Sequence, residues 1–164
     1  MRNIAAVGFG LALFTGLTAI YFSRQQAVAQ ATAPTGLVVK SSPYSVEETE
    51  TRFKQILEAK GLNIFATVDH TQNAVGAGLE LRPTRVVIFG NPKVGTPLMQ
   101  CQQTIAIDLP QKVLIWEDDQ GQVQLAYNDP HYLGGRHRLD GCGVEAIKTI
   151  SGALSNLTDG AITP

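Results

Sequence analysis

The stretch KVLIWEDDQGQVQLAY, residues 112–127, decides the fold class of this chain. Two runs rich in β-branched, aliphatic and aromatic residues flank the polar turn at residues 118–121. In the second run Val123, Leu125 and Tyr127 alternate with polar or small residues, so they point to one face of a strand. The stretch therefore predicts a β-hairpin with one face toward a hydrophobic core.

Three more strands are expected upstream of the hairpin, at residues 37–40, 63–68 and 84–89. Residues 84–89 end in a continuous apolar run from Val86 to Phe89, which is typical of a central strand that is buried on both faces. The alternation that begins at residue 63 places four side chains on one face of its strand: Ile64, Ala66, Val68 and, by extension, His70.

Helices are expected between and after these strands. Ser45, with Glu48 three residues later, forms a capping box at the start of the first helix. Thr96 followed by Pro97 predicts the N-terminus of a helix that continues to Ile105. The remaining helical segments are expected after Asp69, after Asp129 and over residues 143–157.

This order of elements predicts an α+β fold, a two-layer sandwich of helices on a mostly antiparallel sheet, preceded by a hydrophobic N-terminal segment. A single domain is expected over residues 37–160, because 164 residues with 44% hydrophobic content fit one core. The formal net charge of -1 provides no field that gathers nucleic acid or anionic lipid. A nucleic-acid partner is therefore not expected.

The N-terminal segment has the composition of an export signal, with an almost entirely apolar run at residues 4–22 between two arginines. Ala27-Val28-Ala29 suits a signal peptidase, so residues 1–29 are expected to be a signal peptide. The run is also nearly long enough to remain as an uncleaved membrane anchor. Residues 30–36 read as a linker. Both alternatives predict a periplasmic or otherwise extracytoplasmic domain that meets the membrane only through this segment.

Two cysteines, Cys101 and Cys142, are expected to form a disulfide, because exported chains fold under oxidising conditions. The alternative is a metal-handling or thiol-redox protein. Met99, Cys101 and His70 are residue types that bind copper or zinc.

Two observations weaken that metal-handling alternative. No recognised spacing joins His70, His131 and His137, and Met99 lies at a spacing typical of core packing. The first expectation is therefore a chain without a cofactor.

The segment at residues 90–96 is similar in outline to a phosphate-binding loop, but Lys93 comes before the last glycine instead of after it. Nucleotide hydrolysis is therefore not expected. Two hypotheses stay open for this segment: a turn shaped only for packing, and a site where backbone amides and Lys93 hold a small anion at the helix N-terminus. Turn positions supply the rest of the candidate ligand-binding set, which is His70, Lys93, Thr96 and Asn128.

No catalytic constellation is recognisable in the sequence. Glu117, Asp118 and Asp119 cluster at a hairpin tip, which is normally a solvated turn, and no Gly-x-Ser-x-Gly elbow occurs. One remaining enzyme hypothesis uses His70 as a general base. The favoured hypothesis is a non-catalytic module that binds a small ligand or a protein.

Several segments resemble the domain of unknown function 302 family. They are residues 79–84, 89–100, 108–110, 113–118 and 127–137, within a resemblance that runs from Leu37 to Leu157. The resemblance implies a small α/β sandwich that is often a homodimer, and it implies no established activity. Neither cysteine belongs to the family pattern.

Overall fold

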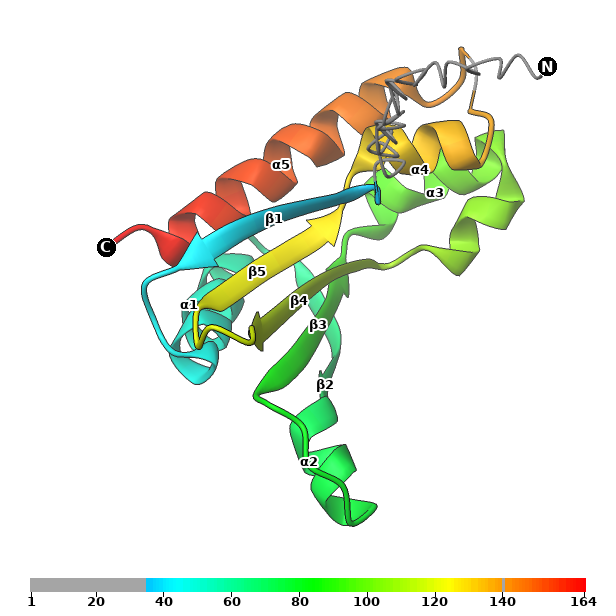
Figure 1. Ribbon diagram of the computed structural model, residues 1–164. Helices are drawn as coiled ribbons and strands as arrows, with labels where there is room; N and C mark the ends of the chain where they lie inside the picture. Colours follow the sequence, from blue (N-terminus) through cyan, green and yellow to red (C-terminus); the bar gives the residue numbers. More distant parts are fainter. Residues whose placement is uncertain (1–34, 140) are drawn as a thin grey trace, which may run out of the picture. The chain divides into compact units, whose positions relative to one another are not determined.

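The computed structural model describes residues 35–139 and 141–164. Within them, a five-stranded antiparallel sheet carries helices on one face, which confirms the predicted α+β sandwich (Figure 1). The expected signal peptide or anchor at residues 1–29 lies outside the described residues. No helix within the described ranges is long and apolar enough to cross a membrane.

The sheet has the order β1-β5-β4-β3-β2, and the predicted hairpin of β4 and β5 lies at its centre. Val113 pairs with Tyr127, and Glu117 pairs with Val123, in the antiparallel register of that hairpin. The bounds of the strands are β1 (Leu37–Ser42), β2 (Asn63–Asp69), β3 (Thr84–Gly90), β4 (Gln111–Glu117) and β5 (Val123–Asn128).

The helices begin largely where the sequence places their caps. The Ser45 hydroxyl accepts a hydrogen bond from the backbone N–H of Glu48, and Asp69 and Asp129 cap the two short helices in the same way. The bounds of the helical elements are α1 (Val46–Ala59), α2 (His70–Gly76), α3 (Pro92–Cys101), the 3-10 helix η1 (Gln103–Ile107), α4 (Pro130–Arg136) and α5 (Val144–Ile162).

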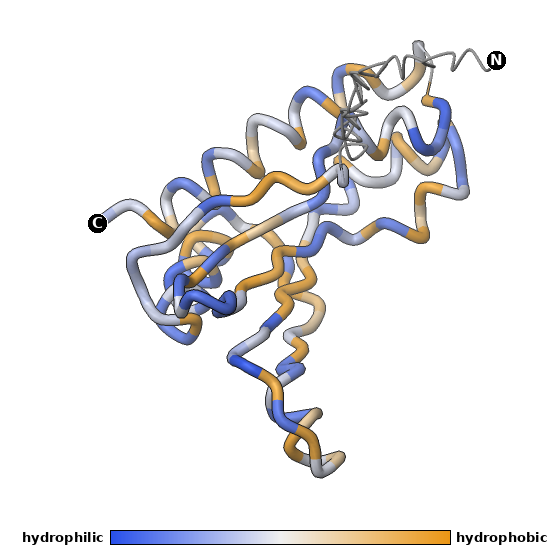
Figure 2. The backbone as a smooth tube through the Cα atoms, in the orientation of Figure 1, coloured by the Kyte–Doolittle hydropathy of each residue, from blue (hydrophilic) through white to orange (hydrophobic). Residues whose placement is uncertain are grey.

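The hydrophobic core lies between one face of the sheet and the helices α1 and α5. Figure 2 shows the hydrophobic stretches that run along these elements. Alternate residues of the central strands are almost completely buried there, namely Val87, Phe89, Val113, Ile115 and Leu125. The helices contribute Phe53, Leu57, Leu154 and Leu157. The sheet therefore presents one face to the core.

Two expectations about the strands are wrong. β3 is not buried on both faces, because Val86 and Ile88 remain partly exposed on the face opposite the helices. The regular alternation predicted for β2 is broken by a bulge between Ile64 and Ala66, which shifts the register against β3.

The expected start of a helix at Thr96 is also wrong. α3 begins at Pro92, because the Asn91 carboxamide accepts a hydrogen bond from the backbone N–H of Lys93 and caps the helix earlier. Pro97 therefore lies inside α3, and Ile105 belongs to the separate element η1. The asparagine cap and the proline at N1 were the stronger signal.

Candidate functional site: an apolar pocket

The pocket lies where β3 ends and β4 begins. Phe89 of β3 pairs with Gln111 of β4, so these two residues share one face of the sheet at this end. Between the two strands the chain forms α3, η1 and a cis peptide bond at Leu109-Pro110. This excursion supplies one wall of the pocket, and α5 supplies another.

The pocket has a volume of about 270 Å³. The excursion between β3 and β4 contributes Val94, Gly95, Thr96, Met99, Ala106, Leu109 and Pro110. α5 contributes Thr149, Ile150, Ala153, Leu154 and Leu157. The sheet side and its edges contribute Leu62, Phe65, Phe89, Gly90, Asn91, Pro92 and Gln111.

Carbon atoms form nearly the whole lining, and no lining residue is ionisable. Two of the polar lining residues are already engaged in the protein: Asn91 caps α3, and the Thr149 hydroxyl donates to the carbonyl of Glu145 at 2.8 Å. A charged group placed here would lose its hydration without gaining an opposite charge. The lining therefore suits a small, neutral and mainly apolar molecule.

The structure brings together only part of the predicted ligand-binding set. Thr96 lines the pocket, and Lys93 lies one helical turn earlier in α3 with its side chain outside the lining. Asn128 ends β5, where it pairs with Leu37 of β1. His70 begins α2, beyond the opposite end of β3, because Asp69 pairs with Arg85 while Asn63 pairs with Gly90.

The N-terminus of α3 offers few free backbone donors to the small anion of that hypothesis. Pro92 has no backbone N–H, and the N–H of Lys93 donates to Asn91. The binding of a small anion at this turn stays a prediction.

Cys101 and Cys142 form the predicted disulfide, with their Cα atoms 5.8 Å apart. The bond joins the last residue of α3 to the turn before α5, so it links the two helical walls of the pocket. In this state Cys101 offers no thiolate to a metal. His70 begins α2 and His131 belongs to α4, and these two helices lie at opposite ends of the domain in Figure 1.

The remaining metal candidates are also separated. Met99 lines the pocket, whereas His137 is hydrogen-bonded to other side chains. Within the described ranges no three or more His, Cys, Asp or Glu side chains are grouped so that they could hold a metal ion.

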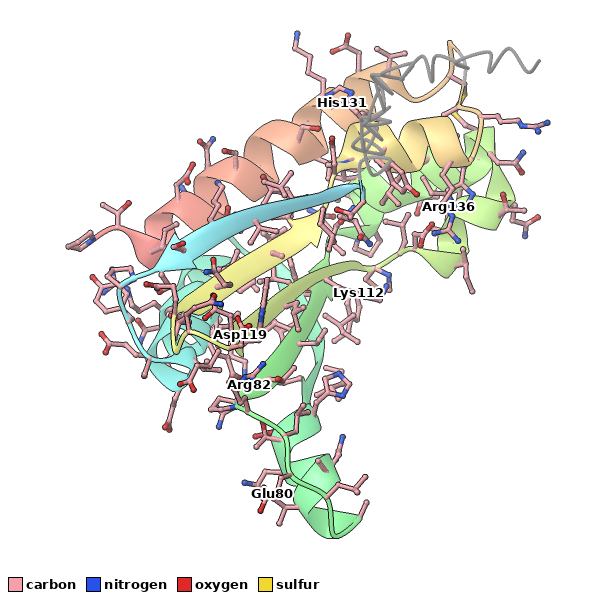
Figure 3. All side chains as sticks on the ribbon, in the orientation of Figure 1. Glu80, Arg82, Lys112, Asp119, His131 and Arg136 are labelled. Atoms are coloured by element: carbon pink, nitrogen blue, oxygen red, sulfur yellow. A yellow bond between two sulfur atoms is a disulfide. The ribbon has the colours of Figure 1, made fainter. Side chains whose placement is uncertain are left out.

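A polar cluster around His137 was not predicted as a site from the sequence. The ring Nε2 lies 2.6 Å from Asp108 Oδ2, and Nδ1 lies 3.2 Å from the Thr104 hydroxyl oxygen. With the proton on Nε2, the ring donates to Asp108 and accepts from Thr104. Arg136 Nε also lies 3.6 Å from the same carboxylate, and Figure 3 shows this arginine on α4.

The cluster connects Thr104 of η1 and Asp108 to His137 at the end of α4. Since Ala106 and Leu109 line the pocket, the cluster fixes one of its walls. Asp108 and His137 both fall within segments that carry the family resemblance, and this was the one signal in the sequence that pointed to them.

A second polar network stabilises the sheet away from the pocket. Glu50 of α1 forms ion pairs with Lys54 and with Arg85, whose Nη1 lies 2.7 Å from Glu50 Oε2. Burial alone would raise the pKa of Glu50, but the hydrogen bonds from Lys54 and Arg85 together hold it below its usual value. This carboxylate is therefore ionised and paired at neutral pH.

The fold and the pocket define a small single-sheet α+β domain with an apolar cavity at one end of the sheet. Residues 38–157 match the family described as "Domain of unknown function DUF302". The chain belongs to this family.

Two curated relatives are similar to the chain over 123 residues at 45% identity. They are fluoride-specific ion channel FluC 1 of Brucella suis biovar 1 and fluoride-specific ion channel FluC 2 of Brucella melitensis biotype 1. The match covers 75% of this chain, but 48% and 46% of those proteins. The chain thus spans about half the length of the curated relatives it matches.

A crystal structure of an uncharacterized conserved DUF302 protein from Bacillus stearothermophilus has the same fold, with a TM-score of 0.69. The similarity covers 77% of this chain and 98% of that one, at 18% identity. It supports the assignment of the fold.

Proposed function

We propose that this protein is a non-catalytic binding module that holds one small, neutral and mainly apolar molecule in the pocket between α3, η1 and α5. The observation that carries the proposal is a cavity of about 270 Å³ without an ionisable residue in its lining. Cavities lined by hydrocarbon are poorly hydrated, so an apolar occupant gains free energy by leaving water.

The lining supports retention of a molecule more than a reaction. Acid–base catalysis needs a group whose pKa lies near the working pH, and nucleophilic catalysis needs a hydroxyl or thiol beside a base. The described lining residues offer hydroxyls only at Thr96 and Thr149, and Thr149 is bonded to a backbone carbonyl. Neither has a base beside it in the lining.

We place this module outside the cytoplasm. The apolar run at residues 4–22 and the Ala27-Val28-Ala29 triplet support export, and the disulfide supports an oxidising compartment. Two relatives named as ion channels support a position beside a membrane. The mass of the mature chain from its own host tests this proposal: a chain that begins at Met1 and fractionates with the cytoplasm would contradict it.

The binding experiment uses the full chain and the neutral fluorescent probe N-phenyl-1-naphthylamine, whose emission rises in apolar surroundings. We expect saturable binding of one probe per chain. Ala153→Trp places an indole in the pocket from α5 and is expected to weaken binding at least about tenfold, because the cavity is filled.

Lys148→Trp is the matched control for this experiment. It adds the same indole to an exposed position of α5 that is not part of the lining. The control is expected to bind the probe as the natural chain does. Absence of saturable binding, or equal binding by the Ala153→Trp chain, would contradict the proposed function.

Two further expectations stay predictions. A metal-handling or thiol-redox role for Met99, Cys101, Cys142 and a histidine is tested by thiol titration with and without reductant, together with elemental analysis. The homodimer implied by the family resemblance is tested by sedimentation velocity of the full chain.

A further inference from the structure

Gln111 is the one residue of the pocket lining that is both polar and buried. It is the first residue of β4, it is 9% exposed, and its neighbours on the same face of the strand are the buried Val113 and Ile115. The register opposite Phe89 directs it to the same face as the hydrophobic core, and it lines the pocket.

The Gln111 carboxamide makes no hydrogen bond with another side chain or backbone group of the described residues. Nor is it sealed inside protein, because Ser151 Oγ is the one enclosed side-chain polar atom without a partner in the described ranges. Because Gln111 lines the pocket, a molecule held there could take the hydrogen bonds that its oxygen and NH₂ group do not make within the described residues.

A buried carboxamide without a hydrogen-bond partner is unfavourable, and native proteins rarely contain one. Replacing it with a leucine of similar size would remove this penalty. An amide in an otherwise apolar lining instead resembles the few polar groups that orient a ligand in a pocket.

We propose that Gln111 is the polar anchor of the pocket, and that the ligand is an apolar molecule with one neutral hydrogen-bonding group, such as a hydroxyl, carbonyl or amide. This inference rests on the proposed function and adds the ligand's chemical class. The hydrocarbon part of the ligand packs between Met99, Leu109 and Leu154, while its polar group reaches Gln111. A charged group would find no opposite charge in the lining.

The test compares naphthalene with 2-naphthol, which differ by one hydroxyl group, as competitors of N-phenyl-1-naphthylamine on the full chain. We expect 2-naphthol to displace the probe at a concentration about tenfold lower than naphthalene, because one buried hydrogen bond separates the two compounds. In the Gln111→Leu chain this preference is expected to vanish, with naphthalene binding retained.

A second readout separates an anchor from a structural role. If Gln111 is unpaired in the empty pocket, Gln111→Leu is expected to raise the melting temperature, whereas loss of an internal hydrogen bond would lower it. Gln100→Leu, at an exposed position of α3 outside the lining, is the matched control and is expected to keep the preference for 2-naphthol.

The outcomes distinguish this inference from the proposed function. Equal binding of the two compounds, or a preference that survives in Gln111→Leu, overturns the role of Gln111 while the pocket remains a binding site. Absence of binding by the probe and by both compounds overturns the two proposals together.

Discussion

His137 Nε2 lies 2.6 Å from Asp108 Oδ2, and this contact joins the end of α4 to the segment between η1 and β4. The two residues are 29 positions apart in the sequence, so the contact fixes a tertiary arrangement and not a local turn. Because Asp108 lies beside Leu109, the contact holds a wall of the pocket in place.

Replacing this histidine tests that relationship. His137→Phe keeps a ring of similar size but leaves Asp108 without its shortest partner, which is expected to destabilise the fold by about 2 kcal/mol in urea unfolding. Binding of N-phenyl-1-naphthylamine is expected to weaken as well, because the wall formed by Ala106 and Leu109 loosens.

His131→Phe is the control, since His131 is exposed on α4 and no side-chain hydrogen bond of its ring is present in the described residues. If His137→Phe and His131→Phe behave alike, His137 does not support the pocket.

Glu50 predicts a pH dependence of stability. Its pKa is lower in the folded chain than the usual value of about 4.3, so its contribution is complete above that value and is lost as the pH falls through the folded pKa. Glu50→Gln is expected to cost about 2 kcal/mol of unfolding free energy at pH 7. The difference from the natural chain should shrink below about pH 4.

Denaturant unfolding between pH 3 and pH 7 measures this effect. Glu58→Gln on the exposed face of α1 serves as the control and should leave stability nearly constant. A Glu50→Gln difference that is the same at both ends of the pH range would show that the ion pairs with Arg85 and Lys54 contribute nothing.

Reduction of the disulfide predicts a large loss of stability. The bond closes a loop between residues 41 positions apart, for which chain entropy in the unfolded state gives about 4 kcal/mol. Urea unfolding with and without dithiothreitol measures the loss. Because the bond also links α3 to the turn before α5, probe binding should weaken under reducing conditions even where the chain remains folded.

Gly36 and Gly61 separate two reasons for a glycine, namely a positive φ and a lack of space for a Cβ atom. Both have a positive φ, of 72° and 65° respectively, but only at Gly36 would a Cβ atom overlap the ring of Tyr132. Gly61→Ala is expected to cost about 1 kcal/mol for the backbone conformation. Gly36→Ala should cost at least about 1 kcal/mol more, because it adds a steric overlap. Equal costs in thermal unfolding would show that the Tyr132 ring simply moves aside.

Local signals in the sequence predicted most of the elements correctly. The alternation in β5 identified its buried face, and the caps at Ser45, Asp69 and Asp129 marked three helix starts, because these signals act over a few neighbouring residues. The start of α3 was misplaced because two cap-and-proline pairs, at Asn91 and at Thr96, lie five residues apart, and the helix uses the stronger asparagine cap.

The pocket depends on contacts that no local pattern contains. Thr96, one of the predicted candidates, lines the pocket, but α5 joins it in the lining from about fifty residues further along the chain. The sequence does show Gln111 as a polar residue on the inward face of β4, two positions before Val113 and four before Ile115. That pattern points to a ligand-binding residue only when the cavity beside it is known.

The position of β1 in the sheet also has a consequence for how the molecule folds. Leu37 pairs with Asn128, and β5 is the one described strand beside β1. The first strand in the sequence therefore pairs with the last. Contacts this distant in sequence slow the search for the native state. During synthesis the sheet cannot close until residue 128 has left the ribosome, so β1 remains an unpaired segment until then.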